Sequence, residues 1–250
     1  MEVVICRDAA QVGIVAAERV ADRLRGRANP VIGLATGSSP LDLYAHLAKL
    51  VDDGALDLSQ AYGFALDEYV GLAHEHPESY HAVIHRTVTE PLRMNPSRVR
   101  VPNGVAADLV GAAQQYEEAI RAAGGVDVQV LGIGSNGHIG FNEPFTSFGS
   151  RTHRVPLTEQ TRNDNARFFD SMDQVPTHAL TQGLATIMDS RTAVLVATGE
   201  HKADAVAAMI EGPVAISMPA SILQFHADVH VVLDEAAAAK LASRDHFHKL

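Results

Sequence analysis

Short apolar runs rich in β-branched residues alternate with alanine-rich segments of helical periodicity along almost the whole chain. This alternation is typical of βαβ units, which build a parallel sheet whose two faces are both covered by helices. The sequence therefore predicts an α/β protein with an open, doubly wound, mostly parallel sheet of the Rossmann-like kind. The 250 residues are enough to bury one sizeable core and show no break in composition, so we expect a single domain over residues 1–250.

The periodicity also predicts the individual elements. Strands are expected over residues 3–6, 31–36, 61–66, 126–133, 192–198 and 229–233. Helices are expected over residues 9–25, 40–51, 76–87, 109–123, 177–188 and 202–211. Residues 145–165 have weak periodicity and many Thr, Arg and Asn residues, and we expect an irregular lid over about residues 145–185.

Unusual polar stretches directly follow several of the expected strands. They are TGSS at 36–39, DEY at 67–69, GIGSNGH at 132–138, TGEHK at 198–202 and DE at 234–235. The carboxyl ends of parallel strands meet at one edge of the sheet, and open α/β sheets bind their ligands there. We therefore expect most of these stretches to contribute to one shared site.

Composition excludes several classes of protein. The 30 acidic residues exceed the 20 basic ones, which argues against binding the phosphate backbone of a nucleic acid. The lone Cys6 excludes an intrachain disulfide and a cysteine zinc site. We find no signal peptide and no apolar run of membrane-spanning length, so we expect a cytoplasmic protein without a membrane partner.

The glycines of the 132–138 stretch form a G-x-G-x-x-G pattern, Gly132, Gly134 and Gly137. A dinucleotide site needs a helix that begins at these glycines, but the next residues, HIGFNEP, do not continue as a helix. We therefore interpret the stretch as a tight turn that presents His138, which exchanges protons near neutral pH. Glu143 follows five residues later and could fold back to orient the imidazole. The residue types alone leave a catalytic and a structural role for His138 equally open.

The stretches at 36–39 and 67–69 each allow two interpretations. Thr36 to Ser39 precede an expected helix and form either an anion nest or a simple helix cap, without the lysine of a P-loop. Successive side chains of a strand point to opposite faces, so at most one of Asp67 and Glu68 points into the site. Burial of that carboxylate would raise its pKa toward that of a useful general base, whereas the alternative is a solvated loop.

Histidines at 81 and 85 lie four residues apart on an expected helix, a spacing known from metal sites. No acidic residue completes an H-E-x-x-H arrangement around His81 and His85. We therefore expect no metal site and interpret the pair as part of a polar helix face.

Seven motifs together resemble the glucosamine-6-phosphate deaminase (isomerase) family in order and spacing. They are GLATGSSP, LDEYVGL, HPESY, LGIGSNGHIGFNEP, TRNDNARFF, VPTHALTQG and TGEHKADAV, and they span nearly the whole chain. The resemblance implies a reaction without a cofactor, in which D-glucosamine 6-phosphate and water give D-fructose 6-phosphate and ammonium. The related 6-phosphogluconolactonase family shares the fold and a Gly-His loop, but not the F-N-E-P found here at 141–144.

The resemblance also implies roles for particular residues. His138 opens the sugar ring with the support of Asn136 and Glu143, and Asp67 moves a proton from C2 to C1. The substrate phosphate is held by Thr36, Gly37, Ser38, Ser39, Arg167 and Lys202. By their own sequence context, Arg167 and Lys202 would be interpreted as surface charges.

Two departures from the family pattern affect these expectations. Asn136 stands where many members carry Asp, so we expect it to form hydrogen bonds rather than to titrate. Members activated by N-acetylglucosamine 6-phosphate carry a basic cluster where this chain has His153, Val155 and Pro156. We therefore expect weak or no activation by that ligand, and whether the chain forms a homo-oligomer stays open.

Two alternatives to the deaminase are kept. One is a hydrolase like 6-phosphogluconolactonase. The other is a sugar-phosphate-sensing domain without catalysis, which would keep the 36–39 loop but need neither Asp67 nor His138. In each case the expected partner is a small sugar phosphate.

Overall fold

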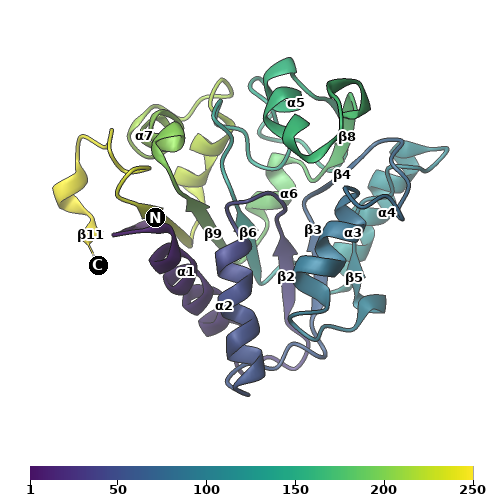
Figure 1. The fold of residues 1–250 in the computed structure, drawn as a ribbon, viewed down its shortest axis with the longest axis horizontal. Coiled ribbons are helices and arrows are strands. Elements are labelled where there is room, and N and C mark those ends of the chain that lie inside the picture. Colours follow the sequence, from purple (N-terminus) through teal and green to yellow (C-terminus); the bar gives the residue numbers. More distant parts are fainter. Residues whose placement is uncertain (250) are drawn as a thin grey trace.

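An eight-stranded parallel sheet runs through the centre of the molecule in the order β11-β1-β10-β9-β6-β2-β3-β5 (Figure 1). The computed structural model describes residues 1–249. The strands are β1 (Glu2–Cys6), β2 (Val31–Leu34), β3 (Tyr62–Ala65), β5 (Val99–Arg100), β6 (Val128–Leu131), β9 (Thr192–Ala197), β10 (Val229–Asp234) and β11 (His248–Lys249). The predicted α/β class and the mostly parallel sheet are confirmed.

Helices cover both faces of this sheet. They include α1 (Ala9–Leu24), α2 (Leu41–Asp52), α3 (Tyr80–Ile84), α4 (Leu109–Ala122), α6 (Leu184–Met188) and α7 (Ala203–Glu211). The remaining α-helix of residues 1–249, α5 (Glu159–Asn165), lies beyond the edge of the sheet, at the top of Figure 1. In Figure 1, α1 and α2 lie in front of the sheet and α6 lies behind it. Neighbouring residues of β2 separate the two faces, because Val31 packs with Ile120 of α4 while Ile32 belongs to the main core cluster with Leu47 of α2.

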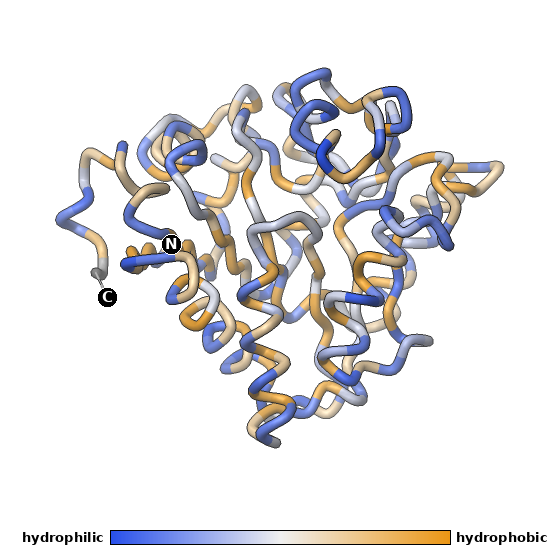
Figure 2. Tube along the Cα trace, viewed as in Figure 1, coloured by the Kyte–Doolittle hydropathy of each residue, from blue (hydrophilic) through white to orange (hydrophobic). Residues whose placement is uncertain are grey.

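Hydropathy follows this layering. The strands of the large sheet are mostly apolar, whereas the segment around α5 is largely hydrophilic (Figure 2). The apolar alternation in the sequence therefore reports the buried sheet, and its weakening after residue 145 reports a segment at the surface.

A second, three-stranded antiparallel sheet was not expected from the sequence. It consists of β4 (Asp67–Tyr69), β8 (His178–Thr181) and β7 (His153–Pro156), with β8 in the middle. The helix predicted over 177–188 is therefore wrong in its first half, since only α6 is helical. The apolar spacing fits a helix, but a helix here would leave the backbone groups of β4 and β7 without their partners.

Two further expectations need correction. The helix predicted over 76–87 begins only at Tyr80, where Ser79 caps it by accepting a hydrogen bond from the Ala82 N–H, and it continues as a π-helical turn over His85–Thr89. The lid segment is more regular than expected, because it contains β7 and α5. The other predicted strands and helices are confirmed to within a residue or two of their ends.

The order of strands creates a crevice between β2 and β6. These strands are neighbours in the sheet, but the next sheet strand after β2 is β3 on one side, and the next after β6 is β9 on the other. The loops at their carboxyl ends therefore diverge, which is the arrangement at which open α/β sheets bind ligands. In the described part of the chain, residues 1–249, no helix has both the length and the apolar character needed to cross a bilayer.

Candidate functional site

A cavity opens at this crevice, and most of the residues expected from the sequence line it. They are Thr36, Gly37, Ser38, Ser39, Asp67, His138, Arg167 and Lys202. These residues come from the carboxyl ends of β2, β3, β6 and β9 and from the turn after α5. Asn136 and Glu143 are not among the lining residues, and both make hydrogen bonds behind His138.

Asp67 and Glu68 point in different directions from the junction of β3 and β4. Asp67 lines the cavity and is 5% exposed. Glu68 is fully buried, and its carboxylate accepts hydrogen bonds from the backbone N–H groups of Tyr69, Tyr80 and His81. The strand pleat thus gives one carboxylate to the cavity and uses the other to hold the start of α3.

The environment of Asp67 makes its carboxyl group a weak acid. Burial, together with the negative charge of Glu68, raises the pKa of Asp67 to about 8. A carboxylate with a pKa near neutrality is a stronger base than a solvated one and takes up a proton more readily from carbon. The group that lines the cavity therefore has the chemistry of a general acid–base.

Asp67 is also expected to make folding stability depend on pH. Its pKa is raised on folding from 3.8 to about 8, so the folded state holds the proton more tightly. The resulting stabilisation is complete below pH 4 and is lost as the pH rises through 8. We therefore expect Asp67→Asn, which removes the titration, to raise the free energy of unfolding at pH 8 by about 2 kcal/mol or more relative to the native chain.

Urea unfolding at pH 4 and at pH 8 measures this difference. The exposed Asp170, changed to Asn, is the matched control and should leave the pH dependence as it is. A pH-independent difference between Asp67→Asn and the native chain would contradict the raised pKa.

The glycines of the 132–138 loop make room for His138. A Cβ atom on Gly134 would lie 2.2 Å from Cε1 of the His138 ring, so a larger residue would collide with the imidazole. Gly137 has a φ of 83°, which side chains of L residues rarely tolerate. The residues that follow form an isolated bridge between Ile139 and Asn142. The interpretation as a tight turn that presents His138 is confirmed, and the helix of a dinucleotide site is not formed here.

A chain of hydrogen bonds connects His138 to Glu143. The Nδ1 atom of His138 lies 2.7 Å from Oδ1 of Asn136, and the Asn136 amide nitrogen donates to Oε2 of Glu143 at 2.7 Å. The direct distance from His138 Nδ1 to Glu143 Oε2 is 3.7 Å. Asn136 therefore stands between the imidazole and the carboxylate and connects them.

This arrangement selects one tautomer of the imidazole. The amide nitrogen of Asn136 donates to Glu143, and its oxygen accepts the backbone N–H of His138 at 3.2 Å, so this oxygen faces His138 and accepts the Nδ1 proton. The other ring nitrogen, Nε2, then carries a lone pair when the ring is neutral. His138 is thus prepared to take up a proton at Nε2 and to give it back.

Glu143 stays ionised. Burial alone would raise the pKa of Glu143, but the hydrogen bonds and charge of His138, together with the hydrogen bonds from Thr161 and Asn136, outweigh it and lower the pKa to about 2. The carboxylate therefore presents a lasting negative charge to the Asn136 amide.

The other end of the cavity has the character of an anion site. The 36–39 loop leads into α2, whose N-terminal N–H groups favour anions, and Arg167 donates to Ser38 Oγ at 3.3 Å. Burial lowers the pKa of Lys202, an effect partly offset by nearby Asp164 and strengthened by Arg167. Arg167, Lys202 and the loop before α2 thus line the same cavity, a combination that suits an anion such as a phosphate.

Some cavity residues were not expected from the sequence. Tyr80, Thr161 and Asp164 also line the cavity. Tyr80 follows the HPE stretch, and the other two lie on α5; nothing in their local sequence shows which side they face. Conversely, the 234–235 pair does not line the cavity, because Asp234 accepts the Gly199 N–H at 3.0 Å and Glu235 pairs with Arg244. Asp234 therefore holds the TGEHK loop in place.

Histidines 81 and 85 show no ligand arrangement. Among residues 1–249 no group of three or more His, Cys, Asp or Glu side chains is placed to hold a metal ion. His81 instead stacks on His74, with ring centroids 4.7 Å apart.

Known proteins resemble the chain over nearly its whole length. A family model described as glucosamine-6-phosphate isomerases/6-phosphogluconolactonase matches residues 7–232. A glucosamine-6-phosphate deaminase of Cutibacterium acnes is 53% identical over 248 residues, covering 99% of this chain and 95% of the relative. One of Streptomyces avermitilis is 54% identical with the same coverage.

Solved structures show the same fold. A structure described as a monomeric glucosamine-6-phosphate deaminase superposes with a TM-score of 0.93 at 42% identity, covering 96% of this chain and all of the other. A 6-phosphogluconolactonase from Trypanosoma cruzi superposes with a TM-score of 0.73 at 20% identity over 96% of this chain and 97% of the other. At 20% identity, the similarity to the Trypanosoma cruzi protein concerns the fold alone.

Proposed function

Because the chain belongs to the family of glucosamine-6-phosphate isomerases and 6-phosphogluconolactonases, we propose that it acts as a glucosamine-6-phosphate deaminase. It converts D-glucosamine 6-phosphate and water to D-fructose 6-phosphate and ammonium. The observation that carries this proposal is a buried acid–base carboxyl, Asp67, in the same cavity as an imidazole relay and an anion site. Lactone hydrolysis requires no proton transfer between carbons.

The proposed reaction begins with ring opening. His138 takes the proton of the anomeric hydroxyl at Nε2 and returns it to the ring oxygen, which gives the open-chain aldehyde. Asn136 keeps the other ring nitrogen protonated, and Glu143 stabilises the imidazolium that forms during the transfer.

Proton transfer between carbons follows. Asp67 removes the proton from C2 and delivers it to C1, while the C1 oxygen gains a proton that the amino group gives up. The aldehyde thereby becomes a C1 alcohol, and C2 becomes an imine carbon. Water then adds to C2 and ammonia leaves, which balances the overall reaction. Thr36, Gly37, Ser38, Ser39, Arg167 and Lys202 hold the phosphate throughout and keep C2 near Asp67.

Ammonium release from glucosamine 6-phosphate, followed with glutamate dehydrogenase, tests the proposal. We expect turnover with this substrate and none with 6-phosphogluconolactone. The reverse preference would support the hydrolase, and binding of the sugar phosphate without turnover would support the sensing domain.

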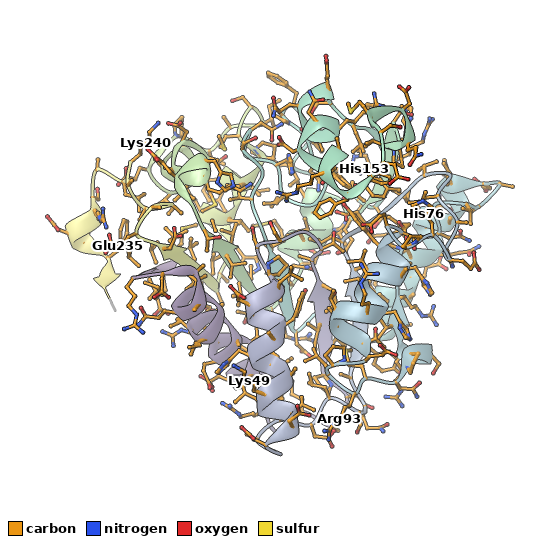
Figure 3. The ribbon with its side chains drawn as sticks, viewed as in Figure 1. Lys49, His76, Arg93, His153, Glu235 and Lys240 are labelled. Carbon is orange, nitrogen blue, oxygen red and sulfur yellow. The ribbon has the colours of Figure 1, made fainter. Side chains whose placement is uncertain are left out.

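We also propose a weak or absent response to N-acetylglucosamine 6-phosphate. Val155 on β7 is buried, Pro156 carries no charge, and His153, on the lid side of the molecule, turns Nδ1 toward the Arg151 carbonyl oxygen at 2.7 Å (Figure 3). Hyperbolic saturation with substrate is therefore expected, unchanged by the ligand. A sigmoidal curve that becomes hyperbolic on its addition would contradict this.

The remaining proposals concern organisation. We propose that residues 1–250 work as one domain in the cytoplasm with a sugar phosphate as their small-molecule partner. The solved relative at 42% identity is described as monomeric, and light scattering decides between a monomer and a homo-oligomer of this chain.

A further inference from the structure

Two separate segments hold the carboxylate of Glu143. Its Oε2 atom accepts the Asn136 amide from the 132–138 loop. Its Oε1 atom accepts two hydroxyls from the lid, that of Thr158 at 3.1 Å and that of Thr161 in a short hydrogen bond. Glu143 is 8% exposed and Thr161 is 2% exposed, so water does not readily replace the Thr161 hydroxyl, whereas Thr158 is an exposed residue.

The two threonines form one unit at the start of α5. Thr158 is the N-cap of this helix, and its Oγ1 accepts the Thr161 N–H at 3.2 Å. The two hydroxyl oxygens lie 3.0 Å apart. The first turn of α5 therefore has to be formed for both hydroxyls to reach Glu143.

Loss of these hydroxyls would change what Glu143 does. A buried carboxylate oxygen without donors is strongly unfavourable, so the group would turn toward the nearest donors. His138 Nδ1 is only 3.7 Å from Oε2, and it is the titratable group that faces Glu143 from the loop. On α5, Asp164 instead faces Ser135 and Gln160. A turned carboxylate would release the Asn136 amide and accept the Nδ1 proton of His138 itself, so the imidazole would lose the orientation that Asn136 gives it.

We propose that Thr158 and Thr161 are positioning residues for the ring-opening step, which hold Glu143 so that Asn136 keeps the Nε2 lone pair of His138 directed at the substrate. This inference rests on the proposed function. The inference gives the lid two roles. Arg167 of the lid contributes to the anion site, and Thr158 and Thr161 complete the hydrogen-bonded chain from His138 through Asn136 to Glu143.

The test compares Thr161→Val with Thr161→Ser and with Thr177→Val. Thr161→Val keeps the shape and removes the hydroxyl, Thr161→Ser restores it, and Thr177→Val makes the same change at an exposed lid position that does not touch Glu143. We expect kcat for glucosamine 6-phosphate to fall about tenfold in Thr161→Val with KM within about twofold, because a hydrogen bond to a charged group is lost. Thr161→Ser and Thr177→Val should stay near the native kcat.

A second readout is independent of turnover. Long-range ¹H–¹⁵N spectra of the His138 ring, assigned with His138→Asn, report which nitrogen carries the proton. The native protein and Thr161→Ser should show the same Nδ1–H signal at pH 8.5, whereas Thr161→Val should shift this signal, because the proton acceptor changes from the Asn136 amide oxygen to the Glu143 carboxylate. An unchanged Nδ1–H signal together with native kcat in Thr161→Val would overturn the inference. Absence of ammonium release by the native protein, with the Nδ1–H signal still responding to Thr161→Val, would instead refute the proposed function and leave the positioning of the imidazole in place.

Discussion

Asp67→Asn is expected to lower kcat for ammonium release about 10²–10⁴-fold, the usual contribution of a general acid–base group. The amide keeps the size and the position of the carboxyl but cannot accept the C2 proton. KM should change little, because the phosphate is proposed to be bound by other residues of the cavity than Asp67. Because the pKa of Asp67 is raised to about 8, native kcat should increase as the pH rises toward 8 and the carboxyl group becomes ionised. The kcat of Asp67→Asn should not increase with pH over this range.

Asp170→Asn provides the control, because it makes the same chemical change at an exposed lid position. A substrate deuterated at C2 adds a second readout: a primary isotope effect on native kcat would show that the C–H bond breaks in a slow step. Turnover retained in Asp67→Asn would contradict the assignment of the base.

His138→Asn is expected to lower kcat/KM for glucosamine 6-phosphate about 10²-fold or more. In the proposed mechanism the imidazole moves a proton between two oxygens, and the asparagine side chain cannot exchange one. An analogue that lacks the 5-hydroxyl cannot close to the pyranose, so its turnover should depend on His138 far less. The ratio of kcat/KM for glucosamine 6-phosphate to kcat/KM for the analogue, both measured by ammonium release, isolates the ring-opening role.

His85→Asn is the matched control for this experiment, because His85 is exposed and lies on the π-helical turn after α3. In His85→Asn the ratio of kcat/KM for the two substrates should equal that of the native chain. An equal loss on both substrates in His138→Asn would show that the imidazole acts after the ring has opened.

The sheet and several cavity residues could be predicted because their signals are local. Apolar alternation reports strands buried on both faces, and polar residues at the ends of such strands meet at one edge by geometry. The positions of Asp67, His138 and the 36–39 loop at the carboxyl ends of expected strands are enough to predict that they share one edge of the sheet. The pleat also predicted that Asp67 and Glu68 would separate.

Other parts depend on contacts between distant segments and leave no local signal. Arg167 reaches Ser38 across 129 positions of sequence, and its own surroundings are those of a surface residue. The three-stranded sheet escaped prediction because Leu180 and Leu184 have helical spacing, and only pairing with β4 and β7 decides that β8 is extended. The DE pair at 234–235 follows a strand end, yet Asp234 binds the backbone of a neighbouring loop and Glu235 pairs with Arg244.

The junction after β3 divides the machinery between two sheets. Asp67 is the first residue of β4 and pairs with Thr181 in the small sheet, whereas His138 stands on a loop from β6 of the large sheet. The small sheet also contains β7, which leads into α5, so the C2 base and the lid share one scaffold while the ring-opening imidazole belongs to another. Hydrogen bonds from Phe141 and Asn142 to Thr181 and Gln182 tie the loop after His138 to the end of β8, so the contact between the two sheets fixes the distance between the two groups to which we assign the proton transfers.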